Sequence, residues 1–226
     1  MLYTEESVRA NIRNREGKRV FYLGKGDSLT SRARDWLRRE RIEILSADLA
    51  KVERYCLANG AYLEEKPEHM THLNAEILVP KTHPRIVFRG AVDTLEAELI
   101  LAQLAAPSVS GKLEEILTLA RKILRCDVLE EPLEDAALCG LTESEQRRRS
   151  HFPQEYYGVA HFMPSAADGE AMVRLNRARC AAREAELRAC EAFSDREGNP
   201  TRPDILRSLN RMSSMLYILM LEQKAQ

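Results

Sequence analysis

The chain has 226 residues, of which 44% are hydrophobic and 31% are charged, as in an ordinary globular protein. Its 34 basic and 35 acidic residues give a net charge of -1, which argues against a dedicated nucleic-acid-binding protein. No apolar run approaches the ~20 residues of a membrane helix, and the acidic opening lacks the apolar stretch of a signal peptide. Five cysteines without framework spacing indicate reduced thiols. We therefore expect a cytoplasmic protein without a membrane or nucleic-acid partner.

Residues 1–60 predict a small mixed extension. A short strand is expected over 19–23, and residues 42–45 alternate between apolar and polar as a second strand does. Polar residues within 27–30 are typical of a helix start, so a helix is expected over 31–40.

Two irregular stretches should follow this extension. Residues 50–65 are expected to form a linker with one helical turn. Residues 66–90 contain three prolines, which exclude a long helix. Cations and hydroxyls in such a loop can cradle phosphates, although a solvated basic loop has the same composition. The residues concerned are Lys66, His69, Thr71, His72, Lys81, His83, Arg85 and Arg89.

Residues 61–226 predict a helical domain. Asp93 is expected to cap its first helix, and loops are expected over 127–140 and 150–169. Several helices with short connections favour a bundle. The fold class is therefore mainly α: a bundle of about five helices, of ferritin-like size, preceded by the small mixed extension. Hydrophobic spacing predicts helices over 94–106, about 113–124, 168–193 and 202–223, and a short polar helix is expected over 142–149.

The helix over 168–193 places charges on a stripe that otherwise has core spacing. Arg179 and Glu186 are seven residues apart and so share a face, and Arg183 lies between them. Burying charge is costly unless it is paired or meets a charged ligand. One interpretation is an anion-binding wall, because guanidinium groups suit phosphate oxygens. The other is a solvated face or a structural salt bridge.

The last helix carries Asn210 in its interior, beside apolar neighbours. Asparagine disfavours helix interiors because its side chain competes for backbone hydrogen bonds. Asn210 therefore either binds a polar ligand or is simply exposed to solvent, and periodicity leaves both interpretations open.

Motifs for metal binding and hydrolysis are missing from the sequence. All five histidines fall in predicted loops, and none forms the helical Glu-x-x-His pair of a di-iron bundle. There is no Cys-x-x-Cys pair, no Walker-type loop and no recognisable catalytic triad. We therefore expect no resident metal site.

Two helix motifs resemble those of the cobalamin adenosyltransferases, in the propanediol-utilisation branch. Residues 178–187 are similar to that branch's A-R-T-x-C-R-R-A-E-R, and residues 209–217 to its L-N-R-L-S-D-x-L-F. The sequence departs from the first motif at Glu184 and Leu187, where the family has arginines, and from the second at Ser214, where it has aspartate. Lys81, Arg85, Gly90 and Asp93 also follow the branch's spacing at the start of its first helix.

The ethanolamine-utilisation branch is similar over most of the chain, from about residue 28 to the end. Some of its members carry a His and Cys-Cys-x-x-Cys metal cluster, of which only Cys56 has a counterpart here. The absence of the rest supports the expectation of no metal site. The matching segments occur in the same order: 29–34, 66–74, 83–86, 150–158 and 161–164.

This resemblance implies an adenosyltransferase-like bundle that transfers the 5′-deoxyadenosyl group of ATP to cob(I)alamin. It implies that Arg179 and Arg183 face the phosphates with Glu186 as their orienting partner, and that Asn210 holds the nucleoside. Phe162 would pack below the corrin and expel its lower axial ligand, with His161 as a competitor for that place. The remaining substrate-binding residues implied are Thr71, His72 and Lys81, on the polyphosphate with Mg²⁺, and Arg85.

The resemblance also implies partners. These are a corrinoid reductase, ethanolamine ammonia-lyase as the recipient of adenosylcobalamin, and further copies of the chain in a trimer or dimer with ATP between subunits. The extension could direct the protein to a bacterial microcompartment. Two other functions stay open: a nucleotide-binding bundle that transfers phosphate, which would need a carboxylate pair for metal, and a corrinoid or ATP carrier without turnover.

Overall fold

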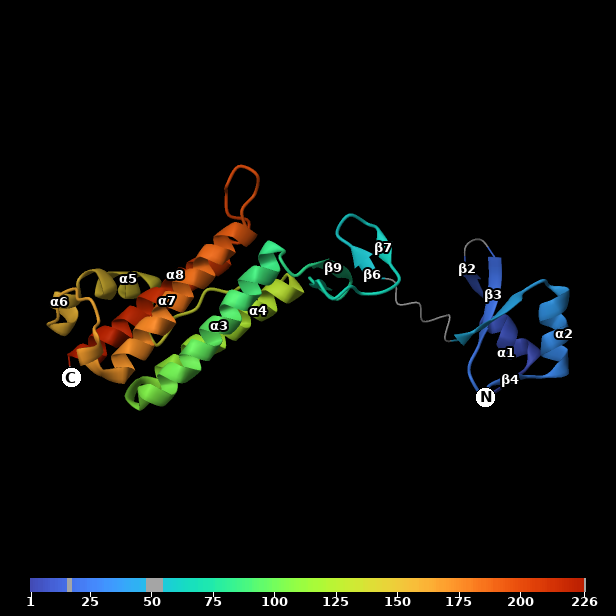
Figure 1. The fold of residues 1–226 in the computed structure, drawn as a ribbon, viewed down its shortest axis with the longest axis horizontal. Helices are drawn as coiled ribbons and strands as arrows, with labels where there is room; N and C mark the ends of the chain where they lie inside the picture. Colours follow the sequence, from blue (N-terminus) through green and yellow to red (C-terminus); the bar gives the residue numbers. More distant parts are fainter. Residues whose placement is uncertain (16–17, 48–54, 226) are drawn as a thin grey trace. The chain divides into compact units, whose positions relative to one another are not determined.

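A computed structural model describes residues 1–15, 18–47 and 55–225 of the chain (Figure 1). Contacts divide the chain into two compact units, Met1–Pro67 and Glu68–Gln226. In the described part of the chain, every helix is too short or too polar to cross a membrane.

The first unit contains a three-stranded sheet in which β3 (Lys18–Leu23) is central. It pairs antiparallel with β2 (Arg13–Arg15) and parallel with β5 (Glu43–Ser46). The strands predicted over 19–23 and 42–45 are thus confirmed. A second pair joins β1 (Leu2–Tyr3) to β4 (Ser28–Leu29) in parallel.

Two helices complete this unit, α1 (Glu5–Ala10) and α2 (Ser31–Arg39). The helix predicted over 31–40 is confirmed, and its cap is Thr30, whose hydroxyl accepts a hydrogen bond from the Ala33 N–H. Both helices contribute to a small core that includes Val8, Phe21, Ala33, Trp36 and Leu37.

The linker predicted over 50–65 is wrong where the structure describes it. Residues 55–65 form no helical turn; β6 (Tyr55–Leu57) and β7 (Tyr62–Leu63) instead pair as an antiparallel hairpin. The hairpin turns at Gly60, whose φ of +83° favours glycine. The rest of the predicted linker, residues 50–54, lies outside the described residues.

The second unit begins with another hairpin, β8 (Met70–His72) and β9 (Ile77–Pro80), followed by α3 (Pro84–Ala105). The predicted start of this helix at Asp93 is wrong by about ten residues. Pro84 stands in the first turn, where its missing N–H costs no hydrogen bond. The cap is His83, whose Nδ1 accepts from the Arg85 N–H at 3.2 Å.

Long helices form the rest of this unit: α4 (Ser110–Leu129), α7 (Gly169–Ala192) and α8 (Pro203–Lys224). In Figure 1, α7 runs beside α3 and α8, and α4 runs beside α3, in agreement with their packing. A mainly α bundle is thereby confirmed, and the predicted helices over 168–193 and 202–223 agree with α7 and α8. The loop predicted over 127–140 begins later, because α4 continues to Leu129.

Two shorter helices precede α7. The predicted polar helix over 142–149 is α5 (Glu143–His151), which packs against α8. Residues 150–169 were expected to be irregular, but they include α6 (Pro153–Tyr157) and a 3-10 turn, Ala166–Asp168.

The core of the bundle fixes the register of α7 against α8. Met172 and Leu175 of α7 and Leu209, Met212 and Leu216 of α8 are at most 1% exposed. Each such side chain stabilises the fold by about 1.5–3 kcal/mol through burial. The polar residues between these core positions are consequently held on one outer seam of the helix pair.

Candidate functional site

A hydrogen bond across the α7–α8 seam joins two of the residues singled out in the sequence. Asn210 Nδ2 donates to Glu186 Oε1 at 3.0 Å. Glu186 is half-buried and Asn210 is exposed. Glu186, expected to orient the arginines, therefore has the amide of Asn210 as its observed partner.

The same seam extends two helical turns further, to Arg179 on α7 and Tyr217 on α8. Seven residues span about 10 Å and return to the same helix face, and the two helices run antiparallel. Arg179 and Tyr217 are thus brought close together. Burial raises the pKa of Tyr217, and the charge of Arg179 opposes this rise. We call Arg179, Glu186, Asn210 and Tyr217 the polar seam.

Two arginines supply the positive charge of this region. Arg179 is half-buried, and its Nε and Nη2 donate to Asn176 Oδ1 at 3.1 and 3.0 Å. Arg183 is exposed, and the described residues provide no hydrogen-bond or ion-pair partner for its guanidinium. Both guanidinium groups can therefore still receive an anion.

Hydrogen bonds of His161 hold the segment after α6 against the polar seam. Its Nδ1 lies 2.9 Å from Tyr217 Oη and its Nε2 3.3 Å from the backbone oxygen of His151. A carbonyl only accepts, so Nε2 carries the proton in the neutral ring and Nδ1 accepts from the tyrosine hydroxyl. The two rings are stacked, with centroids 5.9 Å apart. Phe162 is half-buried, with its ring 6.3 Å from that of Tyr217.

A cavity of about 310 Å³ opens on the other side of Asn210, between α5 and α8. Arg211 is buried there and forms ion pairs with Asp135 and Glu143. Sequence reasoning missed this cavity because α5 is polar on all sides and carries no stripe. The α5–α8 cavity is lined by Glu143, Gln146, Arg147, His151, Asn210, Arg211 and Ser214.

A second group of predicted residues gathers around the start of α3. Thr71 is half-buried in β8, whereas His72 and Lys81 are exposed. Lys81 follows β9, and its backbone N–H donates to the oxygen of His69 at 2.8 Å. No hydrogen bond or ion pair between described side chains connects this group to the polar seam.

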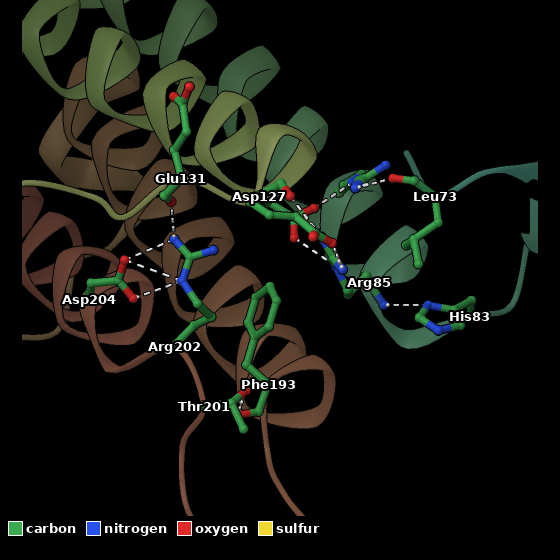
Figure 2. A network of polar contacts seen from close by, with 11 residues as sticks. Leu73, His83, Arg85, Asp127, Glu131, Phe193, Thr201, Arg202 and Asp204 are labelled. Atoms are coloured by element: carbon green, nitrogen blue, oxygen red, sulfur yellow. Dashed lines mark hydrogen bonds and ion pairs between the residues drawn. The ribbon is translucent and has the colours of Figure 1, made fainter. Parts of the chain in front are cut away.

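Arg85, predicted to bind substrate, has a set of partners within the protein (Figure 2). Its Nε donates to Asp127 Oδ1 at 2.8 Å, its Nη2 to the Asp127 backbone oxygen at 2.7 Å, and its Nη1 to Glu130 at 3.1 Å. Asp127 is fully buried, and its other oxygen accepts from Arg89 at 2.6 Å. Arg89 also donates to the Leu73 backbone oxygen at 2.7 Å. This network ties the β8–β9 hairpin to the ends of α3 and α4.

His83 at the α3 cap is affected by burial and by the charges of this network. Burial lowers the pKa of His83, and the charges of Arg85 and Arg89 lower it further. A neutral ring at pH 7 can keep Nδ1 as the acceptor for the Arg85 N–H. Sequence reasoning missed Asp127 because a single aspartate near a helix end gives no signal of burial.

Within residues 1–15, 18–47 and 55–225, no three His, Cys, Asp or Glu side chains gather closely enough to hold a metal ion.

Comparison with known proteins gives a consistent relationship. Residues 61–223 match the cobalamin adenosyltransferase family. Over 158 residues the chain is 37% identical to the corrinoid adenosyltransferase EutT of Salmonella typhimurium and to that of Escherichia coli. The alignment covers 70% of this chain and 59% of each relative, so the chain spans about three fifths of their length.

Two solved structures from Lactobacillus reuteri resemble the fold at 19% sequence identity. One is a variant PduO-type ATP:corrinoid adenosyltransferase complexed with cobalamin and ATP, with a TM-score of 0.54 over 70% of this chain and 88% of that one. The other is a variant complexed with ATP, with a TM-score of 0.50 over 69% and 92%.

Proposed function

The chain belongs to the cobalamin adenosyltransferase family, and from this premise we propose that it transfers the 5′-deoxyadenosyl group of ATP to cob(I)alamin. The electron pair of cobalt(I) forms the bond to C5′ while the C5′–O5′ bond breaks, and triphosphate leaves with the electron pair of the broken C5′–O5′ bond. The products are adenosylcobalamin and triphosphate. The observation that carries the proposal is the Glu186–Asn210 hydrogen bond, whose acceptor lies on the same helix as Arg179 and Arg183.

The arginines have the role of stabilising the leaving group. Cob(I)alamin is itself a strong nucleophile, so the reaction needs no general base. Negative charge grows on the triphosphate as C5′–O5′ breaks, and fixed cations lower the barrier to that change. Arg183 is free to turn toward the triphosphate, and Arg179 is already held by Asn176.

Glu186 and Asn210 act on the nucleoside. The carboxylate of Glu186 fixes one N–H of the Asn210 amide, and this leaves the amide oxygen and the second N–H to bind the substrate. An amide held in one orientation loses less conformational entropy when it binds.

The group of residues near the start of α3 is proposed to hold the polyphosphate of a Mg²⁺-bound ATP. Lys81 and His72 are exposed and Thr71 is half-buried beside them, which suits contact with a phosphate chain. Arg85 is proposed to position this group through Asp127 instead of touching the substrate. We also propose a homo-oligomer, a trimer or dimer, in which ATP lies between subunits.

The corrinoid is proposed to lie over the segment that contains His161 and Phe162. His161 is held in place by Tyr217 and by the backbone of His151, so this segment can pack below the corrin ring as a fixed surface. Displacement of the lower axial ligand by this segment would favour reduction of cob(II)alamin to cob(I)alamin. The same proposal includes ethanolamine ammonia-lyase as the recipient of adenosylcobalamin, a corrinoid reductase as the electron donor, and a cytoplasmic or microcompartment location.

The test is an anaerobic assay with cob(I)alamin, ATP, Mg²⁺ and excess reductant. Growth of the adenosylcobalamin absorbance together with release of triphosphate supports the proposal. Binding of both substrates without product would instead favour a carrier. The residues that motivate this alternative are Glu184 and Ser214, which stand where the propanediol branch has arginine and aspartate.

A further inference from the structure

Two buried polar atoms without partners lie in residues that line the α5–α8 cavity. Gln146 is 2% exposed; its Nε2 donates to the Leu141 backbone oxygen at 3.0 Å, but its Oε1 has no partner. Arg211 is 7% exposed, and its Nε likewise lacks a partner although its two terminal nitrogens bind carboxylates. Among the described side chains, these are the two residues of this cavity with such an atom.

Leaving a buried donor or acceptor unpaired costs about 1–3 kcal/mol. Native proteins therefore leave few such groups, and each one calls for an explanation. Here one atom is an acceptor and the other a donor, in residues that line the same space. A ligand group that offers both a donor and an acceptor matches this pair in chemical type.

The charges around the cavity limit which chemical groups of a ligand can bind there. A phosphate or carboxylate would face the Gln146 oxygen and the carboxylate of Glu143, and a cation would face Arg147 and Arg211. A neutral planar group avoids both conflicts. A cavity of about 310 Å³ has room for a purine ring or for an amide side chain.

We propose that the α5–α8 cavity binds a neutral N–H donor and acceptor pair of a substrate, with Gln146 Oε1 as acceptor and Arg211 Nε as donor. This inference rests on the proposed function, whose substrates offer two sources of this chemistry. One is the amino and ring-nitrogen edge of adenine in ATP. The other is a carboxamide side chain of the corrinoid. Asn210 lines the same cavity and belongs to the polar seam, so the cavity adjoins the proposed reaction site.

Equilibrium binding to the full chain separates these sources. ATP and hydroxocobalamin are titrated separately, by calorimetry, into wild-type protein, Gln146→Leu and the control Gln103→Leu. Gln103 lies on α3, away from the cavity, and donates to Glu114. Loss of one hydrogen bond should weaken binding of one substrate about tenfold in Gln146→Leu alone. Weaker ATP binding identifies adenine, and weaker hydroxocobalamin binding identifies the carboxamide.

Ligand variants test the inference without altering the protein. For the adenine source, wild-type protein should bind purine riboside triphosphate, which lacks the 6-amino group, about tenfold more weakly than ATP, and Gln146→Leu should bind the two alike. For the carboxamide source, one corrinoid monocarboxylic acid should show the same pattern against hydroxocobalamin. The comparison of ligands on wild-type protein alone still tests the inference if Gln146→Leu fails to fold.

Unchanged affinities for both substrates in folded Gln146→Leu would overturn the inference, as would equal wild-type binding of all the ligand variants. Turnover of wild-type protein, measured in parallel, keeps the two proposals apart. Product formation with unchanged Gln146→Leu affinities removes the inference alone. Absence of product removes the proposed function, and the affinities then still decide what the cavity binds.

Discussion

Asn210 on α8 donates a hydrogen bond to Glu186 on α7 across 3.0 Å, and this contact joins two residues that are 24 positions apart in the chain. The bond gives the asparagine one orientation on an otherwise exposed helix face. The contribution of this hydrogen bond to catalysis can be measured by changing the acceptor, Glu186, alone.

Replacing Glu186 with leucine should lower kcat/KM for ATP about 10- to 100-fold. A hydrogen bond to a charged group contributes about 1.5–3 kcal/mol, and here it also orients Asn210. Glu186→Gln keeps an acceptor oxygen and should lose only a few fold. The control is Glu184→Leu on the same helix, because Glu184 pairs with Arg188. An equal loss in the control would show that Glu186 has no special role.

Asp127→Asn should destabilise the protein by about 3–5 kcal/mol, because it leaves two partly buried arginines with a weakened buried partner. Urea unfolding measures the change in the free energy of unfolding. Glu130→Gln is the matched control, since the Glu130 side chain is 60% exposed and surface ion pairs contribute little. Similar midpoints for both variants would contradict the structural role given to Asp127.

The stability contributed by Asp204 should depend on pH. Burial raises the pKa of Asp204, but hydrogen bonds from Arg202 and the Leu133 N–H outweigh it and hold the pKa at about 2. This value lies below the unfolded value of about 3.9. The ionised carboxylate therefore stabilises the fold at neutral pH, and that contribution is lost as the pH falls through about 4 toward 2.

Urea unfolding of Asp204→Asn should consequently show a deficit at pH 7 that stays level to about pH 5 and shrinks by pH 3. Asp93→Asn, at an exposed position on α3, controls for the general effect of acid. A deficit that is the same at pH 7 and pH 3 would refute the assignment.

Tyr217→Phe should raise KM for cob(I)alamin about three- to tenfold and leave KM for ATP within twofold, as the loss of one neutral hydrogen bond predicts. The phenylalanine ring keeps the stacking on His161 but leaves Nδ1 without its donor. Tyr156→Phe, a partly exposed ring near Arg148 and Arg149, is the control. A change in KM for ATP in place of that for the corrinoid would move Tyr217 to the nucleotide side.

The sequence predicted the long helices well, because periodic core positions such as Leu209, Met212 and Leu216 leave few alternatives. The start of α3 lies about ten residues before the predicted one, because prolines within 66–90 favour a loop in the sequence, whereas proline also suits a first helical turn. The β6–β7 hairpin was missed because its strands have two or three residues and show no period.

The candidate site was predicted in part for similar reasons. Arg179, Glu186 and Asn210 stood out as polar residues near a core stripe, and the structure brings them onto one seam. Gln146 and Asp127 did not stand out. Their burial arises from contacts between helices that are far apart in sequence, and spacing within one helix carries no record of those contacts.

The most direct test of the account is the initial rate of adenosylcobalamin formation from cob(I)alamin and Mg²⁺-ATP in three proteins: wild type, Arg179→Ala and Arg188→Ala. Arg188 lies on the same helix but pairs with Glu184 and Glu191, outside the polar seam. We predict product with wild type, a rate within twofold for Arg188→Ala, and a loss of about 100-fold for Arg179→Ala. Absence of product with wild type, or an Arg179→Ala rate equal to that of Arg188→Ala, would contradict the account.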